Sequence, residues 1–386
     1  MNYSEESIQL HTDNKGKWGM HATVPLETRE DLSLAYTPGV GAVSLAIADD
    51  VTRARELTMK GNTVAIVSDG SAVLGLGNIG PEAALPVMEG KAVLFKKFAG
   101  VDGVPIVLNT QDPQEIINIV RGIAPTFGGI NLEDIAAPGC FVVEDALQDL
   151  GIPVFHDDQH GTAIVVVAAL INASRVVGKK LSEMKIVING SGAAGIAIAK
   201  LLGCVGHEDS LCVPVVNLIV CDSKGIISQD RDNLNEYKQQ LLSFTNPENV
   251  TGNLHEALYD ADCFIGVSKG NIIDAEDLQH MAADPIIFGL ANPIPEIMPD
   301  EAKKAGAAVV GTGRSDFPNQ INNVLVFPGI FKGALESGAT QITPAMKIAA
   351  AYALADMVPD SHAESLLPDV FDPRIADIIA GAVKNV

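Results

Sequence analysis

Lys185-Ile186-Val187-Ile188-Asn189, followed at once by Gly190-Ser191-Gly192-Ala193-Ala194-Gly195, is the stretch that decides the fold of this chain. The apolar run predicts a buried strand, and the residues from Ala193 to Leu202 are good helix formers. A glycine-rich loop that leaves a strand and opens a helix turns backbone amides toward a phosphate. We therefore expect the pyrophosphate of a dinucleotide to lie against Gly190, Ser191, Gly192, Ala193, Ala194 and Gly195.

Short apolar runs alternate with helix-forming segments on both sides of this loop. They stand at 63–67, 105–108 and 152–155 before it, and at 218–220, 263–267, 286–288 and 308–310 after it. This alternation is typical of parallel sheets with crossover helices. We predict an α/β chain whose residues 1–158 form a mixed α/β domain. Residues 159–386 are predicted to form a Rossmann-like, doubly wound parallel-sheet domain that binds NAD, with the alanine-rich helices of 324–386 packing back onto the first domain.

The strand after the glycine loop ends in Asp222, which we expect to hydrogen-bond the adenosine ribose. A carboxylate there favours NAD because it repels a 2′-phosphate, although Lys224 keeps NADP open as an alternative. An insertion at 203–214 lengthens the usual spacing. A second GxGxxG match at 75–80 is followed directly by a proline, and we interpret it as a turn of the first domain.

Two acidic pairs stand at the ends of apolar runs. They lie in Asn131-Leu132-Glu133-Asp134-Ile135 and in Phe155-His156-Asp157-Asp158-Gln159-His160-Gly161-Thr162. Carboxylates without cysteine favour Mg²⁺ or Mn²⁺ over zinc. The predicted ligands are Glu133, Asp134 and Asp158, whereas the two histidines are expected to hydrogen-bond rather than coordinate. The alternatives are helix N-capping by the second pair and a solvated turn at the first.

The composition limits which classes of binding partner we expect for this chain. The 386 residues carry a net charge of −22, which repels nucleic acid and anionic membranes, so we expect neither. The longest apolar run, 162–173, is shorter than a bilayer requires, and the N-terminal residues lack a basic segment leading into an apolar one. The five cysteines show no CxxC spacing and are predicted to be reduced thiols of a cytoplasmic protein.

Taken together, several segments resemble the malic enzyme family in its short bacterial form, over nearly the whole chain. They are 35–40, 68–77, 90–95, 131–135, 155–162, 190–195, 291–293 and 322–329. The resemblance implies that Lys91 is the general base and Tyr36 the general acid, and that Glu133, Asp134 and Asp158 hold the metal. It also implies that Asn292 contacts the substrate or the nicotinamide and that Asn322 and Asn323 contact the substrate. Read without it, Lys91 is a surface lysine and Tyr36 a turn-packing aromatic.

The resemblance implies oxidative decarboxylation of L-malate to pyruvate and CO₂, with NAD(P) reduced, by a homodimer that takes small-molecule substrates only. A lysine with a lowered pKa would remove the C2 hydroxyl proton, and a tyrosine would protonate C3 after CO₂ leaves. Longer family members carry an arginine for the substrate carboxylate where this chain has Ala72. Oxaloacetate decarboxylation and a malolactic activity are alternatives on the same scaffold, and a non-catalytic dinucleotide and dicarboxylate sensor is a remote one.

Overall fold

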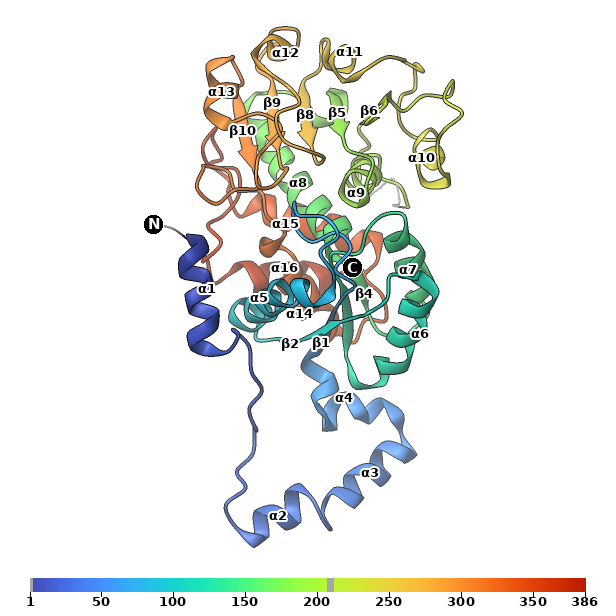
Figure 1. The fold of residues 1–386 in the computed structure, drawn as a ribbon, viewed down its shortest axis with the longest axis vertical. Coiled ribbons are helices and arrows are strands. Elements are labelled where there is room, and N and C mark those ends of the chain that lie inside the picture. Colours follow the sequence, from blue (N-terminus) through green and yellow to red (C-terminus); the bar gives the residue numbers. More distant parts are fainter. Residues whose placement is uncertain (1–2, 207–211) are drawn as a thin grey trace.

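Two separate parallel sheets organise the chain in the computed structural model, which describes residues 3–206 and 212–386 (Figure 1). Part of the N-terminal segment and part of the 203–214 insertion lie outside these residues. The first sheet has the order β2-β1-β3-β4. Its strands are β1 (Thr63–Ser68), β2 (Asp102–Val107), β3 (Gly129–Leu132) and β4 (Val154–His156).

The second sheet has the order β10-β9-β8-β5-β6-β7, and only the short β7 is antiparallel. Its strands are β5 (Lys185–Asn189), β6 (Asn217–Asp222), β7 (Gly225–Ile226), β8 (Cys263–Gly266), β9 (Ile286–Gly289) and β10 (Val309–Thr312). Because the chain leaves β5 toward β6 on one side and later returns to β8 on the other, the strand order reverses at β5. The predicted α/β class with a Rossmann-like sheet is confirmed.

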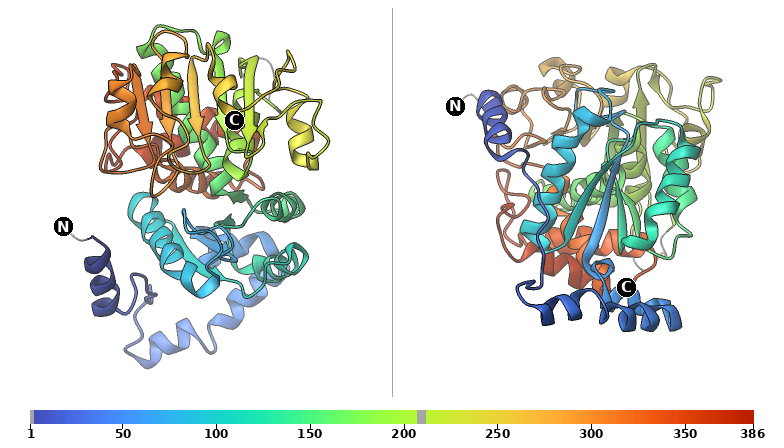
Figure 2. Two further views of the ribbon diagram at one scale, coloured as in Figure 1. Left: turned by 45° about the horizontal axis from the view of Figure 1, so that its top comes forward. Right: turned by 60° about the horizontal axis from the view of Figure 1, so that its bottom comes forward.

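The helices cover the faces of both sheets and continue into an N-terminal extension (Figure 2). They are α1 (Tyr3–Asn14), α2 (Arg29–Ala35), α3 (Val40–Asp49), α4 (Ala54–Leu57), α5 (Pro81–Ala99), α6 (Pro113–Ile123), α7 (Gly139–Leu147), α8 (Asp157–Val176), α9 (Ala193–Leu202), α10 (Glu236–Leu241), α11 (Leu254–Leu258), α12 (Ala275–Gln279), α13 (Pro299–Lys304), α14 (Phe327–Ser337), α15 (Pro344–Asp356) and α16 (Ile375–Lys384).

Helix α8 joins the two sheets and is buried along most of its length. It begins at Asp157, so that Asp157 and Asp158 both lie on its first turn. The helix thereby positions both aspartates at the site. A domain boundary at residue 158 stays a prediction.

The C-terminal helices pack on the first sheet's layer as well as on α8. On α14, the rings of Phe327 and Phe331 lie edge-on to Phe95 of α5, with centroids 4.8 and 5.4 Å apart. Such aromatic pairs stabilise a contact beyond the apolar area that they bury. The last part of the chain therefore covers the same helix that carries Lys91.

The prediction that all five cysteines are free thiols is wrong for two of them. Cys204 and Cys212 form a disulfide in the connection between α9 and β6, with Cα atoms 5.8 Å apart. Cys140, Cys221 and Cys263 are free and buried. The pair was missed because the spacing of the two residues matches no redox or metal motif.

Candidate active site

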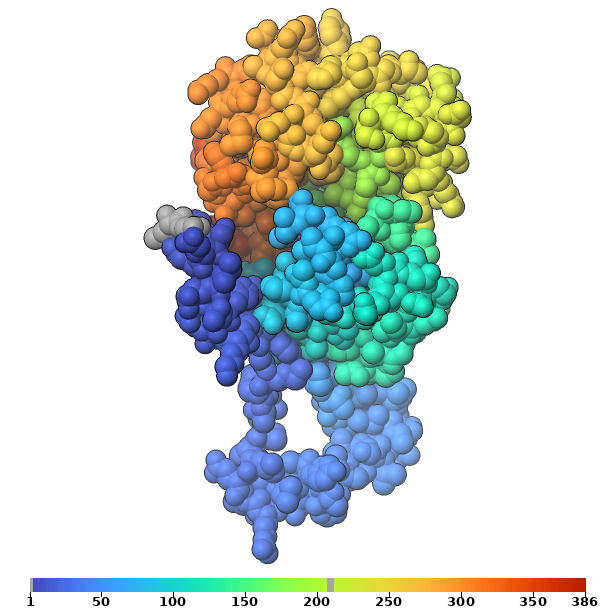
Figure 3. Space-filling model, viewed as in Figure 1, coloured from blue at the N-terminus to red at the C-terminus, as the bar shows by residue number. Residues whose placement is uncertain are grey.

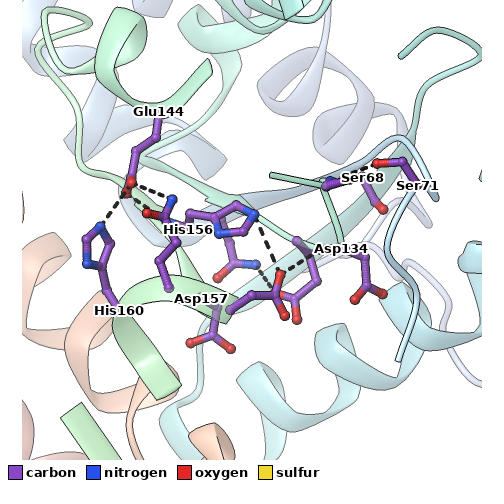
Figure 4. Close-up of polar contacts among 12 residues, drawn as sticks. Ser68, Ser71, Asp134, Glu144, His156, Asp157 and His160 are labelled. Atoms are coloured by element: carbon purple, nitrogen blue, oxygen red, sulfur yellow. Dashed lines mark hydrogen bonds and ion pairs between the residues drawn. The ribbon is translucent and has the colours of Figure 1, made fainter. Parts of the chain in front are cut away.

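Three carboxylates meet where β3 and β4 end. Glu133 and Asp134 follow β3, and Asp158 lies in the first turn of α8, directly after β4. One oxygen of each lies within 4.8 Å of the others. The backbone N–H of Asp134 donates to Asp158 Oδ2 at 2.8 Å and ties the two segments together. Figure 4 shows Asp134 to the right of His156 at this junction.

Without a bound cation, the ionised forms of these three carboxylates are destabilised by their burial in the protein. Burial raises the pKa of Asp134 to about 8, and the neighbouring Asp158 and Glu133 charges add to the effect. Burial also raises the pKa of Glu133 and of Asp158. Asp134 Oδ2 is buried without a hydrogen-bond partner among the described residues. An oxygen-only, negatively charged and incompletely paired cluster fits a divalent cation such as Mg²⁺ or Mn²⁺.

Lys91 projects from α5 into the same cluster and is 7% exposed. Its Nζ lies 2.6 Å from Glu133 Oε1 and 2.5 Å from Asp157 Oδ2, and 4.2 Å from the centroid of the Phe327 ring. Burial alone would lower the pKa of Lys91, but the Asp157 and Glu133 charges outweigh it and raise this pKa overall. The interpretation of Lys91 as a surface lysine is therefore wrong.

The N-capping alternative for the second acidic pair is also wrong. The cap of α8 is His156, and no side chain caps this helix end. Asp157 instead faces Lys91, and Asp158 faces the cluster. A Cβ on Gly161 would lie 1.8 Å from Asp157 Oδ1 and 3.2 Å from the Cβ of Asn323. Glycine at this position therefore makes room for both side chains.

The two histidines of this segment have different surroundings. His160 Nε2 contacts Glu144 Oε2 at 2.9 Å, and Glu144 also accepts from the backbone N–H of His156 and from Gln159 Nε2 (Figure 4). Burial alone would raise the pKa of Glu144, but the contact with His160 lowers it to about 2. His156 Nε2 is 3.6 Å from Asp158 Oδ2, beyond hydrogen-bond distance. Neither histidine is in the three-carboxylate cluster.

The glycine loop after β5 has the close approaches of a dinucleotide-binding turn. Gly190 has φ +124°, and a Cβ on Gly195 would lie 1.7 Å from Gly190 O. Only glycine permits this contact between helix and strand. The loop borders a cavity of about 930 Å³ together with residues that follow β6 and β8. The cavity thus lies where the strand order reverses, as expected for a nucleotide site.

Ala137 and Pro138 also line this cavity, and they follow Asp134 in the same loop. The nucleotide cavity and the carboxylate cluster are therefore joined by one short segment. The loop at 75–80, in contrast, is absent from the residues that line the cavity. A Cβ on Gly75 would lie 1.7 Å from Asn292 O, so this glycine lets the loop after β9 approach the first domain.

Asp222 lines the same cavity, but its carboxylate is already paired. Arg231 donates to both of its oxygens at 2.8 and 3.0 Å, and Lys238 Nζ donates at 2.6 Å. Burial alone would raise the pKa of Asp222, but these hydrogen bonds lower it to about 2. The two positive charges beside Asp222 weaken the repulsion between its carboxylate and a 2′-phosphate. The sequence-based preference for NAD rested on that repulsion.

The three predicted asparagines occupy different places. Asn323 lies beside Gly161 and thus close to Asp157. Asn322 accepts from the backbone N–H of Val324 through Oδ1 and caps the following turn. Asn292 is exposed in the loop after β9. The fold therefore brings Asn323 close to Asp157, the partner of Lys91, whereas the backbone of Asn292 approaches Gly75.

Comparisons with known proteins identify the family of this chain. The family model described as the malic enzyme N-terminal domain matches residues 15–148, and the malic enzyme NAD-binding domain matches 159–385. The chain belongs to the malic enzyme family. A bifunctional malic/malolactic enzyme of Bacillus subtilis is 54% identical over 100% of this chain and 93% of its own length. An NAD-dependent malic enzyme of Geobacillus stearothermophilus is 52% identical over 99% and 78%.

Solved structures in the malic enzyme family share the whole fold. The NAD-dependent malic enzyme of Thermotoga maritima has a TM-score of 0.93 at 49% identity, covering 98% of both chains.

A further relative by sequence, an NADP-dependent malic enzyme of Rhizobium meliloti, is 46% identical over 99% of this chain, which spans 52% of that relative. These relatives confirm the prediction of an NAD(P)-dependent decarboxylating oxidoreductase. They therefore favour an enzyme over the sensor alternative.

Two residues close to Lys91 were underrated from the sequence. Asp157 was noticed only as a member of the second acidic pair, yet it is a direct partner of Lys91. Phe327, which places its ring near Lys91, was noticed only as part of the 322–329 segment. The sequence signal for these two positions beside Lys91 was weak, because each position depends on contacts between residues far apart in the chain.

Tyr36, the predicted general acid of this family, stands apart from the cluster. It directly follows α2, and its side chain is 67% exposed. Figure 1 shows α2 at the end of the molecule opposite the second sheet, well away from the start of α8. One copy of the chain does not bring Tyr36 to Lys91.

Proposed function

We propose that this protein oxidises L-malate with NAD and decarboxylates the product to pyruvate and CO₂, using Mg²⁺ or Mn²⁺ held by Glu133, Asp134 and Asp158. The observation that carries the proposal is the buried Lys91 between Glu133 and Asp157, beside an incompletely paired carboxylate cluster. The loop of Asp134 continues into the wall of the dinucleotide cavity. A hydroxy acid at the cluster can therefore face a nicotinamide in the cavity.

A bound divalent cation supplies Lewis-acid polarisation of the substrate's C2 oxygen. Lys91 must then act as a neutral amine. The carboxylates that raise its pKa include a predicted metal ligand, Glu133, and sharing that charge with a cation lowers the pKa of Lys91 again. Asp157 holds the amine in position.

In the proposed sequence Lys91 accepts the proton of the C2 hydroxyl, and a nicotinamide held in the cavity of the glycine loop would accept the hydride from C2. The resulting 2-keto acid loses its C4 carboxylate as CO₂, and the electron pair of the broken bond forms an enolate. Tyr36 donates a proton to C3 and yields pyruvate. Asn323 lies next to Asp157 and is proposed to contact the substrate, with Asn322 preceding it and Asn292 closing from the opposite loop.

NAD is proposed as the cofactor because a carboxylate, Asp222, stands where the ribose of a dinucleotide binds. Its pairing with Arg231 and Lys238 supports some use of NADP as well. Relatives of both kinds exist, one NAD-dependent in Geobacillus stearothermophilus and one NADP-dependent in Rhizobium meliloti. The ratio of kcat/KM for the two cofactors measures the preference.

The deciding experiment follows absorbance of the reduced nicotinamide with purified protein, L-malate and Mn²⁺, with NAD and NADP in parallel. Reduction that requires the metal and yields equal amounts of pyruvate supports the proposal. Pyruvate formed from added oxaloacetate, without any reduction from malate, favours the oxaloacetate decarboxylase alternative. Chelation of the metal is the matched control.

A malolactic activity is the second candidate, favoured by the 54% identical relative described as a bifunctional malic/malolactic enzyme. The same site would have to reduce pyruvate with the NADH just formed, before either product leaves. Lactate measured after incubation with L-malate, catalytic NAD and Mn²⁺ tests this activity. Pyruvate without lactate under these conditions excludes it.

The remaining parts of the proposal concern the domains, the location in the cell and the oligomeric state. We propose a first domain of residues 1–158 for substrate and metal and a second of 159–386 for the dinucleotide. We also propose that the protein works in the cytoplasm as a homodimer on small molecules. Measurement of mass by sedimentation or light scattering tests the dimer.

A further inference from the structure

Two loops of the second domain follow neighbouring strands and lie against each other. The first, residues 267–274, follows β8, and the second, residues 290–298, follows β9. Strand β8 pairs in parallel with β5 on one side and with β9 on the other. Both loops therefore leave the same edge of the sheet as the glycine loop after β5. They lie on the opposite side of β5 from β6, which carries Asp222.

The strand order indicates which end of a dinucleotide these two loops meet. With the adenosine ribose at Asp222 and the pyrophosphate at the loop after β5, the rest of an extended dinucleotide continues over β8 toward β9. Ser268 and Lys269 of the first loop line the dinucleotide cavity. The second loop reaches the first domain, where a Cβ on Gly75 would lie 1.7 Å from Asn292 O. Figure 3 shows the light blue segment of 70–80 just below the orange surface of the second domain.

Glu296 contacts both loops with one side chain. It is 0% exposed. Its Oε1 accepts from the backbone N–H of Ser268 in the first loop, and its Oε2 accepts from the backbone N–H of Ala291 in the second, each at 3.0 Å. The backbone carbonyl of Glu296 also accepts from the N–H of Ile272 at 3.0 Å. The spacing of the two loops is therefore set at this residue.

A buried carboxylate at this place is costly. No cation contacts Glu296 among the residues that the structure describes, and burying a carboxylate without a counter-charge lowers stability. Burial raises the pKa of Glu296, and the N–H groups of Ser268 and Ala291 act in the opposite direction. A glutamine would keep only one of the two contacts, because its amide nitrogen donates and does not accept. The carboxylate is thus suited to accept from both loops at once.

The two N–H groups that Glu296 binds belong to segments beside the proposed reaction centre. Ala291 directly precedes Asn292, which is proposed to contact the substrate or the nicotinamide. Ser268 lines the cavity, and its Oγ accepts from Asn189 Nδ2 at 2.7 Å. Asn189 ends β5 and directly precedes the glycine loop. A shift of Glu296 would therefore move both walls of the nicotinamide end.

We propose that Glu296 is a positioning residue: its carboxylate fixes the distance between the loops after β8 and β9, and thereby the place of the nicotinamide relative to C2 of the substrate. The inference rests on the proposed function, because it concerns the hydride transfer of that reaction. Glu296 is fully buried and acts through the two loops. A misplacement of about 1 Å in such a site slows a reaction about 100-fold.

Glu296→Gln tests this role with the smallest change of shape. The kcat of malate oxidation should fall about 100-fold, the usual effect of a misplaced reactant. The affinity for ADP-ribose, the part of NAD without nicotinamide, should stay close to the wild-type value because its contacts are expected at β5 and β6. Titration calorimetry measures this affinity and, through the stoichiometry, the fraction of protein that is folded.

A second variant and a control use the same strand. A Cβ on Gly266 would lie 2.3 Å from Cδ of Glu296, so Gly266→Ala displaces this side chain and should give the same pattern while keeping the carboxylate. Asp262→Asn is the matched control. Asp262 precedes the opposite end of β8 and accepts from the backbone N–H of Lys185 at 2.8 Å. This variant should keep the wild-type kcat.

Two results would overturn the proposal. Loss of ADP-ribose binding together with kcat would mean that Glu296 only maintains the fold. Full kcat in Glu296→Gln would mean that the spacing of the two loops does not matter for the reaction. Failure of the proposed function is distinguishable, because the wild type would then bind ADP-ribose and yet not reduce NAD with malate.

Discussion

Buried charge at single residues accounts for the chemistry of this site. Lys91 is 7% exposed and has two carboxylate partners, which raise its pKa in the protein alone. A surface lysine on the same helix, such as the exposed Lys97, experiences neither burial nor these partners. The difference between the two lysines comes from the face of α5 on which each lies.

Replacement of Lys91 by alanine should reduce kcat with L-malate by about 100- to 10,000-fold, the usual contribution of a general acid or base. Binding of NAD, measured by fluorescence or calorimetry, should change little because the cavity of the glycine loop lies elsewhere. Lys97→Ala is the matched control and should keep wild-type activity. Comparable losses in both variants would contradict the role given to Lys91.

The two neighbouring aspartates of α8 should respond differently to amide substitution. Asp158→Asn removes a predicted ligand and should weaken Mn²⁺ binding by at least about 100-fold, while NAD affinity is kept. Asp157→Asn should keep Mn²⁺ affinity and lose kcat, because this side chain faces Lys91. Titration with Mn²⁺ followed by calorimetry distinguishes them. Unchanged metal affinity in Asp158→Asn would exclude Asp158 as a ligand.

At the scale of elements, two glycines of the β5–loop–α9 unit have different structural roles. Gly195 allows α9 to pack on the start of the loop, since a Cβ there would lie 1.7 Å from Gly190 O. A Cβ on Gly192 would meet nothing within 4 Å. The second position is therefore free in the protein and matters only when a pyrophosphate approaches the backbone.

Alanine at these two positions should separate folding from binding. Gly195→Ala should lower the free energy of unfolding by about 1–3 kcal/mol, the usual cost of overpacking, and its melting temperature should fall. Gly192→Ala should melt like the wild type but bind NAD more weakly. Thermal melts and NAD titrations of both variants check the pair. Equal stability of the two would mean that α9 moves away from the loop at little cost.

At the scale of the whole molecule, the carboxylate cluster couples stability to pH and metal. Burial raises the pKa of Asp134 and of Asp157 to about 8, far above the value of about 3.9 for an unfolded aspartate. Between these values the folded protein binds more protons than the unfolded chain. Stability of the metal-free protein must therefore fall as pH rises from about 4 to about 8.

Metal-free protein should accordingly melt at a lower temperature at pH 8 than at pH 6, and saturating Mn²⁺ should remove most of this difference. The metal binds the ionised carboxylates and stabilises the folded state by mass action. Calorimetric melts at both pH values, with and without Mn²⁺, provide the measurement. A melting temperature that rises with pH in the metal-free protein would contradict the raised pKa values.

Short-range patterns were sufficient to predict the class of fold and the type of chemistry. The strand at 185–189 and the helix at 193–202 have the predicted bounds, because apolar periodicity and glycine position act within a few residues. The acidic pairs after β3 and β4 converge because the carboxyl ends of neighbouring parallel strands share one edge of the sheet.

Only the tertiary structure decided the contacts between residues that lie far apart in the sequence. Chain folding brings Lys91 to Asp157, joins Cys204 to Cys212, pairs Asp222 with Arg231 and holds Tyr36 away from the cluster. Each of these outcomes depends on burial and on contacts between distant segments, which arise only when the whole chain packs.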